Sequence, residues 1–330
     1  MSNVRSLIDG YRNTALIYTA VRLDLPDIMG EEASHAEQLA ARIGASAPHL
    51  ARLLDALVLA GVCDRSVDGR YMLTESGLSL RSDSASPHRD LVQIAVEQYW
   101  SPWTNLEHSI RTGEPAFEHL HGMGVFEWRR AHPDANDLFN AWLAKETDSV
   151  VSAIVEAADF SGVATVVDVG GGNGSLLAAL LAQYPHMTGT LFEQAHVVSQ
   201  ARNNLAEKTV SGRVDYCEGS FFTGIPVRAD VYLLKSVLHD WTDDKAITIL
   251  RSCRAAAGDA AKLLLVERLV GEADGDDTAA TMVDIHMMAV TGGRERSRDE
   301  YGALLGQSGF ALSKVSATSC GFCILEALPA

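Results

Sequence analysis

The sequence lacks long apolar segments, has few cysteines and is short of positive charge. No stretch approaches the roughly 20 uncharged apolar residues that a membrane-spanning helix needs. The N-terminal residues lead into an amphipathic pattern and do not resemble a signal peptide. We therefore expect no membrane partner and a cytoplasmic location. The 27 basic and 43 acidic residues give a net charge of −16. This charge repels polyanions, so we also expect no nucleic acid partner.

The five cysteines are scattered along the chain, which indicates reduced thiols rather than a disulfide framework. Cys320 and Cys323 have C-x-x-C spacing, but they fall at a terminal apolar run, where residues three apart point to opposite faces of a strand. The chain also has no His-x-x-x-His motif or comparable cluster. The sequence therefore predicts no metal site.

The most informative positive feature is an apolar run, Thr165 to Val169, that leads into the glycine-rich stretch Gly170 to Gly174. With the apolar stretch Ser175 to Leu181 after it, this pattern predicts a buried parallel strand, a tight turn and a helix. Glycines leave a backbone that a ligand can approach closely, so we expect a nucleotide-type site. A merely tight connection is the alternative.

The spacing of the glycines narrows the class of ligand. The dinucleotide fingerprint G-x-G-x-x-G fails here, because after Gly170 and Gly172 the third position falls on Ser175. An acid, Asp168, lies inside the strand end, and another, Glu193, ends the next apolar run. A carboxylate at the tip of the second strand can accept hydrogen bonds from both ribose hydroxyls. The pattern thus favours an adenosine-containing ligand that is not a dinucleotide.

The first ninety residues predict a separate, mainly helical module. Ser34 is expected to cap a helix, and the sequence patterns predict helices over Leu7–Leu23, Ala36–Ile43 and Pro48–Ala60, then a hairpin around Asp68–Gly69. This order is that of a winged helix, a fold that can bind DNA. Residues 1–90, however, contain nine arginines, no lysine and twelve acids. A packing or dimerisation module is therefore favoured over a DNA-binding domain.

A helical region rich in aromatic residues follows, from Arg89 to about Phe160. Its rings either form core packing between two domains or wall a pocket for a flat apolar substrate. The aromatic residues in question are Tyr99, Trp100, Trp103, Phe126, Trp128, Phe139 and Trp142.

From Thr165 onward, predicted strands and helices alternate, which is typical of an α/β fold with an open, mostly parallel sheet and helices on both faces. Two closing runs, Ala311–Val315 and Cys323–Leu328, are expected to form an antiparallel hairpin at one edge. The parallel strands are expected at Thr165–Val169, Thr188–Phe192, Arg213–Cys217, Asp230–Lys235 and Lys262–Val266.

Polar residues follow each of these strands, and the carboxyl ends of parallel strands meet at one edge of a sheet. Lys235 and His239 follow the fourth strand, and Glu267 closes the fifth. A histidine beside a carboxylate is the usual form of a general base, because the acid fixes the imidazole tautomer and stabilises its cation. By this topology Glu267 is within reach of His239. We therefore predict His239 as a base, with a purely structural histidine as the alternative.

Three separate segments together resemble the S-adenosylmethionine-dependent O-methyltransferases of the caffeic acid and bacterial natural-product type: Val167–Gly174, Leu233–Asp244 and Gly292–Ser297. Near the front of the chain, Leu25–Asp27 and Leu73–Gly77 are similar to the family's winged-helix dimerisation domain. The resemblance covers nearly the whole chain. It implies S-adenosylmethionine as cofactor, a Rossmann-like methyltransferase sheet and a homodimer formed through the N-terminal domain. The implied domains are 1–100 for dimerisation, and 101–330 for the helical bridge with the methyltransferase domain.

The resemblance also implies a set of residues around the cofactor. Glu193 would hold the ribose hydroxyls, Ser220 and Phe221 would flank the adenine, and Lys235 would lie near the cofactor. Many family members have Asp where this chain has Ser220, so the adenine contact is expected to differ. The full set is Thr147, Asp168, Gly170, Gly172, Glu193, Ser220, Phe221 and Lys235.

For catalysis, the resemblance implies that His239 is the base, that Glu267 and Glu295 bracket it, and that Asp240 helps to position the substrate. The segment Asp284–Thr291 is one residue shorter than in the plant members and lacks their substrate-side Asn, so substrate identity stays open. A phenol has a pKa near ~10 and histidine one near ~6.5, so a carboxylate-backed histidine can take a phenolic proton as attack begins. We therefore expect a phenolic or enolic hydroxyl on a small aromatic molecule.

Two alternatives remain at this point. One is a family relative that binds the same cofactor but performs N-methylation or a non-methylating reaction such as hydroxylation or decarboxylation. The other is a winged-helix regulator that senses a small molecule.

Overall fold

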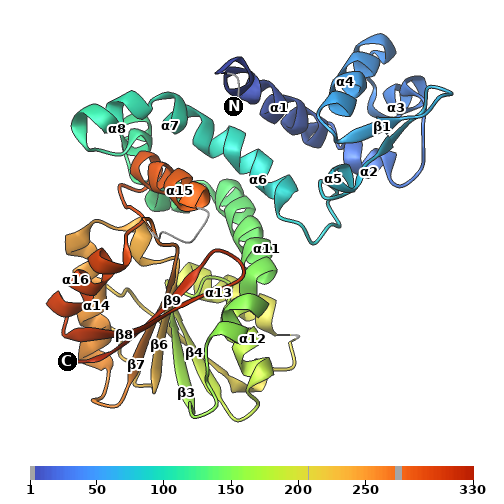
Figure 1. Ribbon diagram of the computed structural model, residues 1–330. Helices are drawn as coiled ribbons and strands as arrows, with labels where there is room; N and C mark the ends of the chain where they lie inside the picture. The colour runs from blue at the N-terminus through green and yellow to red at the C-terminus, as the bar shows by residue number, and fades with distance from the viewer. Residues whose placement is uncertain (1–3, 207, 272–276) are drawn as a thin grey trace. The chain divides into compact units, whose positions relative to one another are not determined.

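The computed structural model describes residues 4–206, 208–271 and 277–330 (Figure 1). The chain divides into two compact units. The first comprises Met1–Ser101 and His132–Glu146, and the second comprises Pro102–Ala131 and Thr147–Ala330. No helix among the described residues is long and apolar enough to cross a membrane.

The first unit consists of helices and a small hairpin. Leu39, Leu54 and Leu57 are fully buried in its core, which places the apolar faces of neighbouring helices against one another. The helix, helix, hairpin order expected from the sequence is present. The elements are α1 (Val4–Arg22), α2 (Leu25–Met29), α3 (Ala36–Ile43), α4 (Ala47–Leu59), β1 (Cys63–Arg65), β2 (Tyr71–Leu73), α5 (Glu75–Leu78), α6 (His88–Ile94), the π-helical turn η1 (Ala95–Tyr99) and the first part of α11 (Pro133–Ala157).

The start of α3 differs from the prediction. The N-cap is His35, whose backbone N–H donates to the Gln38 side chain at 2.9 Å, and not Ser34. Ser34 instead pairs with Tyr71 through two backbone hydrogen bonds of 2.9 Å. The long-range pairing keeps Ser34 extended beside the hairpin, so the helix begins later than the local pattern indicates.

The second unit is built on a seven-stranded sheet with the order β5-β4-β3-β6-β7-β9-β8. The first five strands are parallel, and β9 and β8 are antiparallel, as the sequence predicts. The strand order reverses between β3 and β6, and such a switch point is where open α/β sheets bind ligands. The strands are β3 (Thr165–Val169), β4 (Thr188–Glu193), β5 (Val214–Glu218), β6 (Val231–Lys235), β7 (Lys262–Glu267), β8 (Phe310–Ala317) and β9 (Cys323–Pro329).

Alternating apolar residues bury both faces of this sheet. Val166 and Leu233 belong to the core on the side of the last part of α11, α12 (Ser175–Gln183) and α13 (Ala195–Leu205). Their neighbours Val167 and Leu234 belong to the core on the side of α14 (Asp243–Ala256) and α16 (Arg298–Gln307). Because side chains of a strand alternate between faces, such runs must be apolar throughout. This explains why the strands were readable from the sequence.

Short helices and one longer helix complete the second unit. α15 packs against α8 and α9, and α9 packs against α10. In Figure 1, α15 and α8 lie beyond the same end of the strands of the sheet. The remaining elements are α7 (Trp100–Thr104), α8 (Leu106–Thr112), α9 (Ala116–His121), α10 (Val125–Ala131), α15 (Asp277–Val290) and the short 3-10 turns η2 (Ser211–Arg213) and η3 (Leu238–Asp240).

Candidate active site

The glycine turn after β3 has a backbone that other residues could not adopt without strain. Gly170, Gly172 and Gly174 have φ values of 71°, 58° and 79°, in the left-handed region that only glycine enters readily. A Cβ on Gly171 would lie 2.3 Å from the Oδ2 atom of Asp168. The turn therefore packs closely on Asp168, and its glycines leave a backbone without side chains that a ligand can approach, as a nucleotide cradle requires.

Glu193 lies at the tip of β4 and contacts this turn. Its carboxylate accepts a hydrogen bond from the Gln194 N–H at 2.6 Å and another from the backbone of Gly172. Burial raises the pKa of Glu193, and these two bonds oppose the rise. A carboxylate has about four acceptor positions, so two remain for other donors. These fit the paired hydroxyls of a ribose.

The opposite wall of the turn is aromatic. A Cβ on Gly170 would lie 3.6 Å from the Cε1 atom of Phe221. Phe221 in turn meets the edge of Trp241, with ring centroids 6.1 Å apart, and Phe126 of α10 stacks on Trp241 at 5.5 Å. Ser220 begins a tight turn, because its carbonyl accepts from the Thr223 N–H at 2.9 Å. Phe221 can therefore offer a ring to an adenine, and Phe126 extends the aromatic wall.

The other expected cofactor residues lie deeper. Asp168 is only 1% exposed, and its Oδ2 atom has no hydrogen-bond partner in the structure. Burial raises the pKa of Asp168 to about 7, although the nearby Lys235 charge opposes the rise. The Lys235 ammonium lies 5.4 Å from the centre of the Phe322 ring. Thr147 is buried on α11. An acceptor is thus buried directly beneath the glycine turn, where a cationic ligand group would stabilise it.

The glycine turn adjoins the loop that carries His239. A Cβ on Gly170 would lie 3.1 Å from a methyl of Val237, two residues before the histidine. The chain leaves β6 through Ser236, whose φ of 53° is unusual for a residue other than glycine. This bend at the switch point brings the histidine loop beside the expected cofactor cradle.

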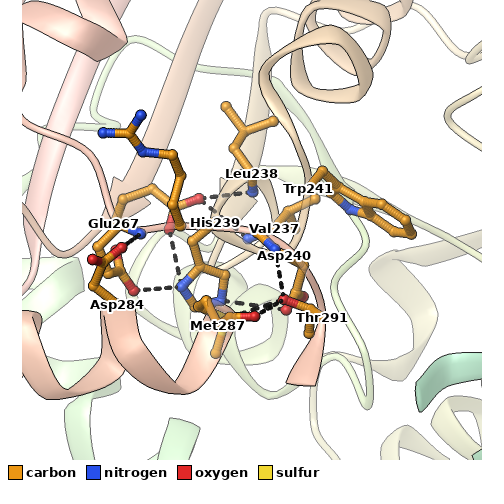
Figure 2. A network of polar contacts seen from close by, with 12 residues as sticks. Val237, Leu238, His239, Asp240, Trp241, Glu267, Asp284, Met287 and Thr291 are labelled. Carbon is orange, nitrogen blue, oxygen red and sulfur yellow. Dashed lines mark hydrogen bonds and ion pairs between the residues drawn. The ribbon is translucent and has the colours of Figure 1, made fainter. Parts of the chain in front are cut away.

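His239 is surrounded by three carboxylates. Its Nδ1 atom lies 2.7 Å from Oε1 of Glu295 and 3.8 Å from Oε2 of Glu267, and its Nε2 atom lies 4.0 Å from Oδ1 of Asp240. Figure 2 shows the His239 ring with Asp240, Glu267 and Met287 around it. Strand order alone predicts that Glu267 lies within reach of His239, and the 3.8 Å separation agrees with this. The direct hydrogen bond belongs to Glu295, which follows α15.

Each of the two glutamates forms further hydrogen bonds. Glu267 is fully buried, and its Oε1 atom accepts the backbone N–H groups of Val237 at 3.2 Å and Leu238 at 2.9 Å. Glu295 is held by its own N–H, which donates to Asp284 of α15 at 2.9 Å. Asp284 was not singled out from the sequence as a site residue, since its role depends on how α15 packs.

These charges set the protonation of the site. Burial lowers the pKa of His239, but the charge of Glu267 and the hydrogen bond to Glu295 outweigh this effect and raise the pKa to about 9. Burial raises the pKa of Glu267 to about 7, and burial also raises that of Asp240. A histidine bonded in this way through Nδ1 presents Nε2 as its acceptor when it is neutral.

The groups of His239, Glu267 and Glu295 could also surround a cation, because their ligand atoms lie within 4.8 Å of one another. Nδ1 of the histidine is already hydrogen-bonded to Glu295, however, and one oxygen of Glu267 accepts two backbone N–H groups. A base backed by carboxylates therefore fits this arrangement, and the absence of a metal site stays a prediction.

A second histidine, which the sequence reasoning missed, lies on α15. The indole N–H of Trp103 donates to Nδ1 of His286 at 3.0 Å. Burial, followed by the positive charges of Arg129 and His239, lowers the pKa of His286 to about 4. His286 is thus a neutral imidazole with its proton on Nε2. Of the aromatic residues noted in the sequence, Trp103 therefore has a polar role.

Comparison with known proteins agrees with this geometry. The profile of the O-methyltransferase domain matches residues 103–311, and that of the O-methyltransferase dimerisation domain matches residues 5–81. The chain belongs to the O-methyltransferase family. The predicted family, fold class and class of enzyme are confirmed.

Individual relatives of this O-methyltransferase cover nearly its whole length. Phenazine O-methyltransferase PhzM of Lysobacter antibioticus is 38% identical over 98% of this chain and 94% of its own. The solved structure of LaPhzM has a TM-score of 0.94 and 38% identity, and covers 99% of this chain and 98% of that one. The structure of NcsB1, an O-methyltransferase from neocarzinostatin biosynthesis solved with S-adenosylmethionine and 2-hydroxy-5-methyl naphthoic acid, has a TM-score of 0.86 and 32% identity, covering 100% and 99%.

The relatives also include a protein named for a different reaction. Aclacinomycin 10-hydroxylase RdmB of Streptomyces purpurascens is 36% identical to this O-methyltransferase over 89% of this chain and 80% of its own. Overall similarity therefore does not by itself separate methyl transfer from hydroxylation, whereas the residues of the site can.

Proposed function

We propose that this protein transfers a methyl group from S-adenosylmethionine to a phenolic hydroxyl of a small, natural-product-like aromatic molecule, with His239 as general base. The observation that carries the proposal is the 2.7 Å hydrogen bond between Nδ1 of His239 and Glu295, on a loop that adjoins the glycine turn. It provides a base with a fixed tautomer beside a cradle that suits an adenosine.

The base acts through Nε2. Glu295 accepts a hydrogen bond from Nδ1–H, so the lone pair of neutral His239 is on Nε2 and can take the proton of a hydroxyl. Glu295 and Glu267 then stabilise the imidazolium that forms. Asp240, 4.0 Å from Nε2, would orient the hydroxyl for this transfer. As its proton moves to Nε2, the hydroxyl oxygen gains negative charge and becomes the nucleophile for the methyl group.

The raised pKa of His239 suits a phenolic substrate. A pKa of about 9 lies close to the value of ~10 for a phenol, so the proton transfer costs little free energy. An aliphatic alcohol would hold its proton far more tightly. The electrostatics of the site therefore favour a phenol or an enol over an alcohol.

S-adenosylmethionine would supply a methyl group on a positively charged sulfur. Glu193 would bind the ribose hydroxyls, Gly170 and Gly172 would line the methionine and ribose, and Phe221 with Ser220 would flank the adenine. The buried acceptor Asp168, partly balanced by Lys235, would favour the cationic character of the cofactor. Thr147 would complete the pocket from α11.

We further propose that the protein is a homodimer formed through its N-terminal domain. Four apolar residues of α1, spaced as one face of a helix, are exposed: Val4, Leu7, Ile8 and Tyr11, at 68%, 66%, 61% and 52%. An apolar stripe of this kind normally marks an interface, and it coincides with the matched dimerisation domain. The five free thiols fit a reducing compartment such as the cytoplasm.

N-methylation, hydroxylation and decarboxylation are the competing reactions. None of them needs a base of raised pKa aimed at a hydroxyl, whereas His239, Glu267 and Glu295 together form one. This is the reason to favour O-methylation.

The test is to incubate the protein with S-adenosylmethionine and a panel of phenols, with matched anilines and hydroxyl-free analogues as controls. The expected product gains one CH₂ by mass spectrometry and shows a methoxy signal by NMR. A product methylated on nitrogen, or one that gains oxygen or loses carbon dioxide, would contradict the proposal.

A further inference from the structure

Arg296 is a fully buried arginine in the second unit. Its side chain is 1% exposed, among the lowest of the described charged residues. The cost of burying a guanidinium is large unless all of its donors are bonded. The groups that accept its hydrogen bonds therefore indicate which part of the chain Arg296 stabilises.

The guanidinium is saturated with hydrogen bonds. Nη1 donates to the carbonyl of Leu238 at 2.9 Å and to that of Arg294 at 3.3 Å, and Nη2 donates to the carbonyl of Trp241 at 2.7 Å. Nε and Nη2 both donate to Oδ1 of Asp243, at 2.9 and 2.8 Å. The five N–H donors of the guanidinium thus form five hydrogen bonds. A lysine, which has three donors on a single nitrogen atom, could not reproduce them.

Two of these acceptors flank the proposed base. Leu238 directly precedes His239 in the chain, and Trp241 follows two residues later. The 3-10 turn η3 leaves the Trp241 carbonyl without a partner in the turn itself, and Arg296 supplies one. Asp243, the first residue of α14, ties the same guanidinium to the start of that helix. Arg296 therefore links the backbone on both sides of His239 to the start of α14.

Glu267 and Gly293 complete the support of this loop. Glu267 accepts the N–H groups that enter the loop, at Val237 and Leu238. On the other side, a Cβ on Gly293 would lie 2.0 Å from the His239 carbonyl oxygen, and the Arg294 N–H donates to that oxygen at 2.8 Å. The loop that carries Glu295 thus packs directly on the backbone of His239.

We propose that Arg296 is a positioning residue for His239: by binding the carbonyls of Leu238 and Trp241, it fixes the distance between the imidazole and the Glu295 carboxylate. This inference rests on the proposed function, in which His239 is the base. It assigns a task to the second arginine of the segment Gly292–Ser297, whose neighbour Glu295 provides the hydrogen bond itself.

Arg213 provides a matched control. It also donates from its guanidinium to three backbone carbonyls, those of Leu181 at 2.7 Å, Met187 at 2.9 Å and Tyr184 at 3.3 Å. These carbonyls lie before β4, at the amino edge of the sheet and away from His239. Arg213 is half-buried. A loss of stability that is common to arginines bound to several backbone carbonyls will therefore appear in Arg213→Lys as well.

The experiment compares Arg296→Lys, Asp243→Asn and Arg213→Lys in the full-length protein. For Arg296→Lys we expect kcat to fall by about 10²-fold, the size of effect that a small misplacement of a reacting group produces, with the Kd for S-adenosylmethionine unchanged. Asp243→Asn leaves every backbone contact of Arg296 in place. It therefore tests the positioning role even if Arg296→Lys does not fold. We expect a smaller fall in the same direction. Arg213→Lys should lose thermal stability but keep its kcat.

Two further readouts separate positioning from a general structural loss. With an acceptor phenol that is already ionised at the assay pH, the deficit of Arg296→Lys should shrink, because that substrate needs no base. By NMR, the pKa of His239 in Arg296→Lys should fall toward its ordinary value as contact with Glu295 loosens. An unchanged kcat in a folded Arg296→Lys, or an unaltered His239 pKa, overturns the inference. If no phenol is methylated, the proposed function fails, whereas the NMR comparison still decides the positioning role.

Discussion

The Nδ1 atom of His239 lies 2.7 Å from Oε1 of Glu295, a residue 56 positions further along the chain. The histidine follows the fourth parallel strand, and the glutamate follows α15. Their contact combines a strand end with a loop from the helical cap of the sheet. It is the relationship on which the proposed chemistry depends.

Replacing His239 with Ala should lower kcat by about 10²-fold or more, because proton transfer by a positioned base contributes an effect of this size. Calorimetry should give an unchanged affinity for S-adenosylmethionine, since the glycine turn is untouched. His186→Ala, at an exposed position just before β4, is the control and should keep full activity. A His239→Ala enzyme as fast as the parent would remove the base assignment.

The reaction rate should rise with pH above neutrality. The neutral form of His239 is the active base, and burial lowers its pKa while Glu267 and Glu295 raise it to about 9. The rising limb of kcat/KM should therefore extend above the ordinary histidine range near ~6.5. In Glu295→Gln the negative charge that helps to raise this pKa is gone and only a neutral amide oxygen remains to accept the Nδ1–H, so the rising limb should move to lower pH while the maximal rate falls. If the rising limb of the pH profile is at the same pH in Glu295→Gln as in the parent, Glu295 does not set the pKa of His239.

Replacing Glu193 with Gln should weaken the binding of S-adenosylmethionine. Hydrogen bonds to a charged group contribute about 1.5–3 kcal/mol, which corresponds to a Kd about 10- to 100-fold higher. Glu218 is the matched control, because it is the register partner of Glu193 on the neighbouring strand β5. Glu218→Gln should bind the cofactor as the parent does. Equal losses in the two variants would mean that charge at this edge matters, and not a specific ribose contact.

The paired substitution Leu7→Glu with Ile8→Glu should convert the protein from a dimer to a monomer, because it places charges in the apolar stripe of α1. Light scattering after size-exclusion chromatography measures the mass directly. Val67→Glu, at a fully exposed apolar position in the hairpin turn, should stay dimeric. A parent protein that is already monomeric would refute the proposed interface.

His286 should stay neutral well below the usual histidine range. Burial and the positive charges of Arg129 and His239 lower its pKa to about 4, so the folded protein resists protonation there, whereas the unfolded chain takes up the proton near ~6.5. Stability should therefore fall as the pH drops from about 6.5 toward 4. Two-dimensional NMR of the imidazole nitrogens should report the Nε2–H tautomer from pH 8 down to 5. Titration of His286 near 6.5 would contradict the hydrogen bond from Trp103.

Much of the second unit could be predicted from local pattern. The strand Thr165–Val169 has the predicted bounds, and β4, β6 and β7 each differ from the prediction by one residue at one end. The prediction Arg213–Cys217 is shifted by one residue at both ends, because β5 is Val214–Glu218. This succeeds because strands buried on both faces must be apolar throughout. The cap of α3 failed for the opposite reason, since Ser34 is held by Tyr71 and nothing near Ser34 in the sequence records that contact.

By itself, the sequence determined the alternation of strands and helices, the glycine turn with its acid at the next strand tip, and the edge at which polar residues collect. These features follow from periodicity and from the rule that carboxyl ends of parallel strands meet. The tertiary structure alone decided that Glu295 rather than Glu267 bonds His239, and that Arg296 holds the carbonyls around it. Hydrogen bonding requires atoms within about 3 Å in a set orientation, and that depends on how α15 and the loop after it pack on the sheet.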